Sequence, residues 1–172
     1  MLKTLAMTYS KSAQRILDAF RDLVLCTPYD QLTIGNIIDR AGVARSTFYV
    51  HFPDKRTLLM HSLEPLLDTF VRCVAHEAQR AEVVEFVEHC WDNRVYGRAI
   101  LASPAQRAAV SGLAQMLQLR ADVPPIDSTA LAHGLLGVLA RWMGGELAAD
   151  QEDVVNWLLN QAWEGGKPCN QN

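Results

Sequence analysis

Apolar side chains recur every three to four residues along most of the chain, with charged and polar residues between them. This spacing places the apolar positions on one face of an α-helix. No stretch shows sustained apolar and polar alternation together with the β-branched residues and turn dipeptides that hairpins need. The pattern therefore predicts an all-α fold.

The first fifty residues are predicted to form three short helices. The first runs from about Ser10 to Cys26 and carries its apolar residues on one face. A second begins after Thr33, a residue type that caps helix N-termini, and ends at Gly42, which tolerates a left-handed backbone. A third helix follows after two residues and stops before Pro53.

A longer fourth helix is predicted to connect this cluster to the rest of the chain. Asp54 is a candidate cap, and apolar residues continue at helical spacing as far as Val74. Pro65 lies inside this helix, where it removes a backbone donor and is expected to produce a kink. Further helices are predicted over residues 81–93, 95–102, 105–119, 127–143 and 150–163, with breaks at prolines and a glycine pair.

The segment Leu32–Leu59, LTIGNIIDRAGVARSTFYVHFPDKRTLL, holds the most informative pattern in the chain. Two short helices joined by a glycine-containing turn are the arrangement of a helix-turn-helix unit. Phe48 and Phe52 lie four residues apart on one face and are expected to turn into the core. The opposite face then offers Arg45, Ser46, Thr47, Tyr49, Val50 and His51 to the outside.

The side chains of that outer face can read DNA. Arginine can bond guanine edges, hydroxyl groups can bond bases or phosphates, and valine can meet a thymine methyl group. Thr33 and Lys55 stand at helix N-termini, where free backbone N–H groups and partial positive charge favour phosphate oxygens. The flanks are expected to position the unit, and the middle of the third helix to set sequence preference.

The run AGVARSTFYVHFPDK resembles the signature of TetR/AcrR-family transcriptional regulators, AGV-S-x-GTFYxYF followed by a lysine-containing helix start. The resemblance extends over about residues 10–60. It implies a double-stranded DNA operator with Thr33, Tyr49, His51 and Lys55 at phosphates, and Ala44, Arg45, Ser46, Thr47 and Val50 near bases. Arg45, Ser46 and His51 depart from the commoner signature residues, and this bears on which operator is bound. A plain three-helix packing unit with a polar surface is the competing interpretation.

The charge is distributed unevenly between two predicted domains. The chain has a net charge of −3, which excludes a uniformly basic surface that coats nucleic acid. Residues 1–56, the predicted helix-turn-helix DNA-binding domain, carry eight basic and five acidic side chains. Residues 57–172, the predicted ligand-binding and dimerisation domain, carry eight and fourteen. The basic excess therefore lies where DNA is expected to bind.

The last two predicted helices are rich in apolar and small residues. Such a pair of helices can leave apolar surface uncovered, which suggests a partner, and the family resemblance also implies a homodimer built as a four-helix bundle. The alternative is an intramolecular core, because apolar helix stripes usually face one. The candidate interface residues are Leu131, Leu135, Leu139, Trp142, Val155, Leu158, Leu159 and Ala162.

The region between these helices and the helix-turn-helix unit is a candidate ligand site. Mostly apolar cavities with a few polar groups bind small molecules, and the resemblance implies a repressor released from DNA by a small apolar or amphipathic ligand. The candidate lining residues are Met60, Leu63, Leu67, Phe70, Phe86, His89, Trp91, Tyr96 and Met116. Each of them taken singly is also an ordinary core filler.

Other classes of protein find little support in the sequence. No motif of a hydrolase, P-loop, zinc protease or dinucleotide-binding enzyme occurs, so neither enzymatic activity nor a metal or cofactor is expected. The four cysteines lack a CxxC pair, and no apolar run is long enough for a signal peptide or a membrane span, which predicts reduced thiols in a cytoplasm. A helical protein-interaction module without DNA binding or ligand regulation is the alternative function.

Overall fold

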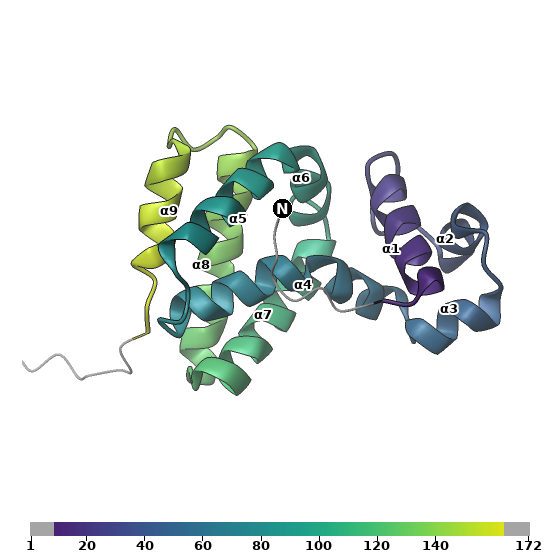
Figure 1. Cartoon of the computed structure of the whole chain (residues 1–172), viewed down its shortest axis with the longest axis horizontal. Helices are drawn as coiled ribbons and strands as arrows, with labels where there is room; N and C mark the ends of the chain where they lie inside the picture. The colour runs from purple at the N-terminus through teal and green to yellow at the C-terminus, as the bar shows by residue number, and fades with distance from the viewer. Residues whose placement is uncertain (1–8, 164–172) are drawn as a thin grey trace, which may run out of the picture.

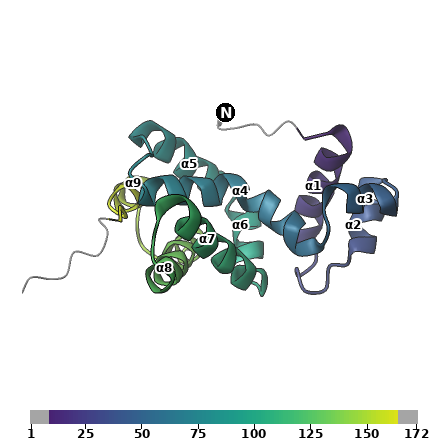
Figure 2. The same cartoon turned by 90° about the horizontal axis from the view of Figure 1, so that it is seen from below.

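The computed structural model describes residues 9–163, and within that range the chain forms nine α-helices and no strand. The predicted all-α fold is confirmed. Figure 1 shows α1, α2 and α3 grouped at one end of the molecule, with α4 running from them into a bundle formed by α5–α9. The same separation is visible after a quarter turn in Figure 2.

The N-terminal unit consists of α1 (Lys11–Val24), α2 (Ile34–Ala41) and α3 (Arg45–His51). Ser10 and Thr33 cap the first two helices through side-chain oxygens that accept from backbone N–H groups. Gly42 ends α2 with φ of 60°, the left-handed conformation expected of a helix C-terminal glycine. The buried side chains that hold the three helices together are Ile16, Leu17, Phe20, Leu32, Ile37, Phe48 and Phe52.

Helix α4 (Lys55–Val74) joins the two parts of the molecule. Asp54 caps it, because its carboxylate accepts from the Thr57 backbone N–H at 2.6 Å. Pro65 lies inside the helix, and its carbonyl accepts from the Thr69 hydroxyl at 3.0 Å. The kink predicted at Pro65 stays a prediction, as does the boundary between residues 56 and 57, which falls in the first turn of α4.

The remaining helices form a bundle in which α5, α7 and α9 contact α4. Helix α7 lies between α4 and α8, while α6 packs on α7 and α8, and α9 packs on α5 and α4. Arg80 of α5 reaches α9, where it pairs with Glu152 and donates to Asn156 at 2.9 Å. The bounds of these helices are α5 Arg80–Asp92, α6 Arg94–Leu101, α7 Ala105–Ala121, α8 Pro125–Met143 and α9 Gln151–Leu159.

The last helix is shorter than predicted. It ends at Leu159, four residues before the predicted end, and the Trp163 backbone N–H instead donates to the Val74 carbonyl at 2.9 Å. This bond draws the chain back onto the end of α4. Ala162, predicted to lie on α9, therefore lies beyond the helix.

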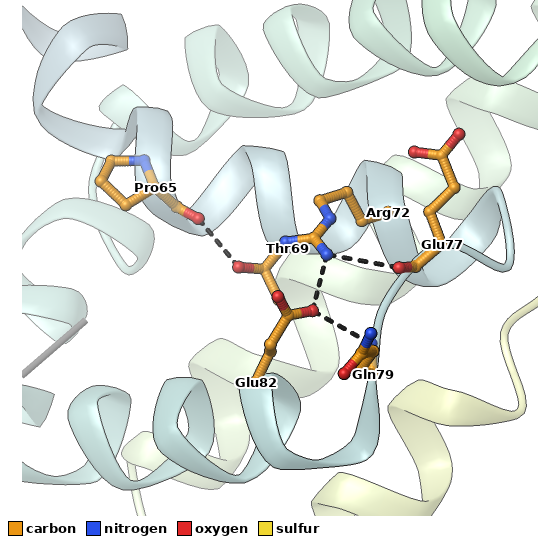
Figure 3. Close-up of polar contacts among 6 residues, drawn as sticks. All are labelled: Pro65, Thr69, Arg72, Glu77, Gln79 and Glu82. Carbon is orange, nitrogen blue, oxygen red and sulfur yellow. Dashed lines mark hydrogen bonds and ion pairs between the residues drawn. The ribbon is translucent and has the colours of Figure 1, made fainter. Parts of the chain in front are cut away.

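A polar cluster joins α4 to the start of α5 (Figure 3). The Arg72 guanidinium donates to the Glu82 carboxylate at 2.6 Å and to the Glu77 carbonyl at 3.3 Å. The same carboxylate accepts from the Gln79 backbone N–H at 3.0 Å, which closes a capping box. The Gln79 backbone N–H and then Arg72 hold the pKa of Glu82 below its ordinary value of 4.5.

Replacing Glu82 by glutamine is expected to lower the melting temperature by about 2–4 °C, because it removes ~1 kcal/mol of charge-assisted bonding to Arg72 and the Gln79 N–H, although a glutamine can still complete the capping box. Because the folded pKa lies below 4.5, the contribution of this carboxylate is fully present above that pH and is lost as pH falls through the folded pKa. Melting curves at neutral and acidic pH measure both effects. Glu85→Gln, at an exposed position of the same helix, is the control.

Candidate nucleic-acid interface

The orientation of α3 determines which side chains it presents. Phe48 and Phe52 are 0% and 1% exposed, with ring centroids 6.0 Å apart, whereas Val50 on the opposite side is 79% exposed. The predicted inward packing of the two phenylalanines is therefore confirmed. Ala44, Arg45, Ser46 and Tyr49 are exposed, and Thr47 and His51 are half-buried.

Arg45 and Tyr49 form a pair on the exposed side of α3. The Arg45 guanidinium donates to the Tyr49 hydroxyl at 3.2 Å and lies 5.6 Å from the centre of its ring. The Tyr49 ring in turn meets Phe48 edge to face, with centroids 5.5 Å apart. This stack limits the conformations of an otherwise exposed arginine, so less freedom is lost when it binds a base edge.

His51 faces α1 within the N-terminal unit. Its Nε2 lies 2.7 Å from the Ser12 hydroxyl and 3.2 Å from the Ser10 hydroxyl. These bonds tie the last turn of α3 to the first turn of α1. The phosphate contact expected of His51 stays a prediction, and such a contact would compete with the two serines.

Thr33 is exposed and acts as a cap. Its hydroxyl accepts from the Asn36 backbone N–H at 3.2 Å and donates to the Asn36 side-chain oxygen at 2.5 Å, and that oxygen also accepts from the Thr33 N–H at 3.0 Å. The hydroxyl proton is thus already used inside the protein. Its phosphate contact stays a prediction.

Lys55 turns back toward the loop between α1 and α2. Its ammonium group donates to the carbonyls of Tyr29 at 2.7 Å and Leu32 at 2.6 Å, and it lies 4.4 Å from the centre of the Tyr29 ring. Burial lowers the pKa of this ammonium group, and Asp30 partly opposes that effect. The phosphate contact expected of Lys55 also stays a prediction.

Lys11 and Arg56 are among the exposed basic residues of this unit that the sequence reasoning did not single out. Lys11 stands in the first turn of α1, and Arg56 follows Lys55 in the first turn of α4. The run Asp54-Lys55-Arg56 shows two adjacent cations at a helix start. Which of the two faces solvent depends on how α4 is rotated against the α1–α2 loop, and the sequence carries no direct signal of that rotation.

The predicted ligand residues are mostly packed against neighbouring helices. A Cβ built on Gly112 would lie 2.0 Å from the Met60 methyl carbon, which shows how closely α4 and α7 approach. Phe70 meets Phe86 with ring centroids 5.8 Å apart, and the Tyr96 hydroxyl donates to Ser62 at 3.1 Å. Leu63 and Leu67 are buried, Trp91 and Met116 are half-buried, and His89 is exposed.

Two grooves in the described structure lie away from those residues. One, of about 290 Å³, lies on α8 and is lined by residues that include Leu131, Gly134 and Trp163. The other, of about 320 Å³, lies between α1 and α2, beside the ion pair of Arg40 and Asp22. The predicted ligand site stays a prediction, with His89 placed outside its packed part.

The predicted dimer residues mostly face the inside of the chain. Five of them are at most 2% exposed, namely Leu135, Leu139, Trp142, Val155 and Leu158. The Trp142 indole N–H also donates to the Ala149 carbonyl at 3.0 Å. These five have no free surface for a partner, because α8 and α9 use them to cover the bundle core. The intramolecular alternative accounts for them. Leu131, Leu159 and Ala162 are half-buried.

Three of the four cysteines lie in the described part of the chain. Burial raises the pKa of the Cys73 thiol to about 11 and of Cys90 to about 12, so both are protonated at neutral pH. Cys26 is exposed, and Cys169 lies outside the described residues. Over residues 9–163 no three His, Cys, Asp or Glu residues are grouped to hold a metal ion. None of the helices in this range has the length and hydrophobicity to cross a membrane.

The fold and the exposed face of α3 define the class of an all-α helix-turn-helix protein. Residues 16–61 match the family model described as bacterial regulatory proteins, tetR family. The chain belongs to this TetR family.

Two curated relatives extend the match beyond the helix-turn-helix unit. The HTH-type transcriptional regulator AlkX of Mycobacterium tuberculosis is 30% identical over 122 residues, 69% of this chain and 57% of that protein. The HTH-type transcriptional regulator EthR of Mycolicibacterium smegmatis is 27% identical over 118 residues, 60% of this chain and 51% of that protein. The chain thus spans little more than half the length of these relatives.

Solved structures share the fold at lower identity. The dihydroxyacetone kinase operon activator DhaS superposes with a TM-score of 0.51 at 16% identity, over 88% of this chain and 96% of that one. A transcriptional regulator from Aquifex aeolicus also gives 0.51, at 17% identity, over 86% and 95% of the two chains. The whole described architecture, including the C-terminal bundle, is therefore that of these regulators.

Proposed function

We propose that the protein is a cytoplasmic, DNA-binding transcriptional regulator that acts by binding rather than by catalysis. One observation carries the proposal: the burial of Phe48 and Phe52 orients α3 so that Arg45, Tyr49 and Val50 face outward. Those side chains match the donor and methyl pattern of the major groove. The match of residues 16–61 to the TetR family supports the same function.

We also propose that the protein acts as a homodimer on a palindromic operator. The outer face of α8 supports this, because Ile126 is 84% exposed and is followed on the same face by exposed Ala130 and Gly134. A Cβ at Gly134 or Gly137 would meet nothing within 4 Å, so the backbone of another helix can approach closely. The adjoining groove of about 290 Å³ offers further apolar surface. A second copy related by a two-fold axis would cover this face.

Two further parts of this proposal come from the family resemblance. The regulator represses transcription, and a small apolar or amphipathic ligand releases it from the operator. A ligand can act only through unequal affinity for two arrangements of the chain. Helix α4 supports such coupling because it extends from the helix-turn-helix unit into the bundle. A ligand that alters the packing of α4 on α7 would change the spacing of the two recognition helices.

Selection of bound sequences from random duplex DNA tests the proposed function. A recovered palindrome with half-sites about one helical turn, ~34 Å, apart or a multiple of it is the expected result. Affinity for the recovered duplex should fall steeply with added salt, because phosphate neutralisation releases counterions. A protein-interaction module would recover no consensus and would prefer no duplex over any other.

Replacing Arg45 by alanine is expected to weaken binding to the recovered duplex by ~1–3 kcal/mol and to relax preference at one base pair. The reason is that Arg45 is exposed on α3 and held by the Tyr49 stack. Affinity measurements against single-base variants of the duplex give both quantities. Arg98→Ala removes the same charge from an exposed position on α6 and should leave the preference unchanged.

A further inference from the structure

We propose that Tyr49 is a positioning residue for Arg45, so that its hydroxyl group helps to determine the base preference of α3. The inference rests on the proposed DNA binding and assigns a further residue to its specificity. The Arg45 guanidinium donates to the Tyr49 hydroxyl at 3.2 Å and lies 5.6 Å from the centre of the Tyr49 ring. Tyr49 therefore contacts the arginine through both its hydroxyl group and its ring.

The spacing of the two residues on the helix explains this contact. Side chains four residues apart lie next to each other on a helix, and long ones point back toward its N-terminus. The Tyr49 side chain thus extends over the turn that begins with Arg45, the first residue of α3. Its ring meets Phe48 edge to face at 5.5 Å, and Phe48 has no exposed surface. Arg45 is therefore attached to the core of the unit through an aromatic side chain with few rotatable bonds.

Arg45 is badly placed to stabilise α3 itself. It is the first residue of the helix, where the partial positive charge of the N-terminus opposes a cation. In the part of the chain that the structure describes, no carboxylate lies within ion-pair distance of its guanidinium. The charge of Arg45 is therefore left for a partner outside the chain, and Tyr49 holds it in place for that partner.

The hydroxyl group of Tyr49 can serve Arg45 and DNA at the same time. Its oxygen accepts from the guanidinium, which leaves the hydroxyl proton to donate to another acceptor, such as a phosphate oxygen. Hydrogen bonds joined in such a chain strengthen one another. The phosphate contact expected of Tyr49 and the base contact expected of Arg45 would then depend on each other.

The contact also lowers the entropic cost of reading a base. A free arginine side chain loses rotational freedom when it binds in one geometry. Because Tyr49 already restrains the guanidinium of Arg45, less of that freedom is lost at the correct base pair. A wrong base pair offers the restrained fork no matching acceptors. We therefore expect Tyr49 to contribute to discrimination between base pairs as well as to overall affinity.

A double-mutant cycle on the duplex recovered by selection tests this role. Arg45→Ala first identifies the base pair that Arg45 reads, as the position at which preference is lost. Fluorescence anisotropy then measures affinity for the preferred duplex and for the duplex changed at that pair. The proteins compared are the unmodified chain, Tyr49→Phe, Arg45→Ala and the double variant. Tyr49→Phe keeps the ring and its contact with Phe48, so it is expected to fold, and its melting curve checks this.

Tyr49→Phe is expected to reduce discrimination at this base pair roughly two- to tenfold, the effect of leaving one long side chain unrestrained. The double variant should discriminate as Arg45→Ala does, because no group remains to be positioned. Tyr29→Phe, which removes a hydroxyl group outside α3, is the matched control and should leave discrimination unchanged. Relaxation measurements on the Arg45 side-chain nitrogen, made without DNA, should show greater mobility in Tyr49→Phe.

Equal loss of affinity for both duplexes in Tyr49→Phe, with unchanged discrimination, would overturn the positioning role and leave Tyr49 as a phosphate contact alone. A further loss of discrimination in the double variant would also overturn it, because Tyr49 would then read a base itself. So would an Arg45→Ala variant that keeps full preference at every base pair. Failure of the unmodified protein to select any duplex would instead overturn the proposed function, and the relaxation measurement would still report whether Tyr49 restrains Arg45.

Discussion

Phe48→Ala is expected to unfold the N-terminal unit at a free-energy cost of about 3–5 kcal/mol and to abolish DNA binding. Phe48 has no exposed surface and contacts both Phe52 and Tyr49 through its ring. Its removal would leave a cavity beneath the helix that presents Arg45. A three-helix unit of this size has a small free energy of unfolding, so a loss of this magnitude removes much of it.

The position of the tryptophans makes this loss measurable in isolation. All four, at positions 91, 142, 157 and 163, lie outside α1–α3. Tryptophan fluorescence therefore follows the bundle, while far-ultraviolet circular dichroism follows every helix. In Phe48→Ala the dichroism transition should begin at lower denaturant than the fluorescence transition.

Val50→Ala is the control, because this side chain on the same helix is 79% exposed and its loss should change stability by less than about 0.5 kcal/mol. If Phe48→Ala melted like Val50→Ala in both signals, the inward packing of α3 would not be what supports the unit. DNA binding by Phe48→Ala at unmodified affinity would contradict the same argument.

The helix starts could be predicted from sequence because local chemistry specifies them. Thr33 and Asp54 were predicted as caps, and each accepts a bond from a backbone N–H group in the structure. The inward side of α3 was equally predictable, since two phenylalanines four residues apart leave little choice. Local sequence also specified the turn at Gly42.

Side-chain direction at helix ends was less predictable. Lys55 and Arg56 are adjacent cations, and only the packing of α4 against the turn that contains Tyr29 decides which is engaged. His51 likewise forms hydrogen bonds with two serines at the start of α1 that are about forty positions away in the chain. Long-range contacts of this kind leave no periodic signal in the sequence.

The apolar pattern of α8 leaves the interface prediction ambiguous for a related reason. Leu135, Leu139 and Trp142 form a stripe that could face a partner or a core, and periodicity alone does not tell the two apart. The structure places this stripe inside and turns the small residues Ala130 and Gly134 outward. Small residues carry a weak hydrophobic signal, although they allow the closest approach of two helices.

Gly134→Glu is therefore expected to convert the proposed homodimer to monomers and to weaken operator binding by roughly 100-fold or more, because linked half-sites gain 10²–10⁴ in avidity. The folded monomer should tolerate the change, since a Cβ at Gly134 meets nothing within 4 Å and glutamate favours helix more than glycine. In a two-fold interface the two introduced carboxylates, one from each copy, would lie close to each other and lose their contact with water. Both effects destabilise the dimer.

Sedimentation velocity at micromolar concentration measures the assembly, and circular dichroism checks that the helices remain. Gln115→Glu, at an exposed position of α7, adds the same charge to another helix and should leave the assembly unchanged. If Gly134→Glu remained a dimer with full operator affinity, the outer face of α8 would not be the contact surface. Because the change leaves the buried stripe intact, a monomer obtained here would assign the contact to the small-residue face rather than to Leu135 and Leu139.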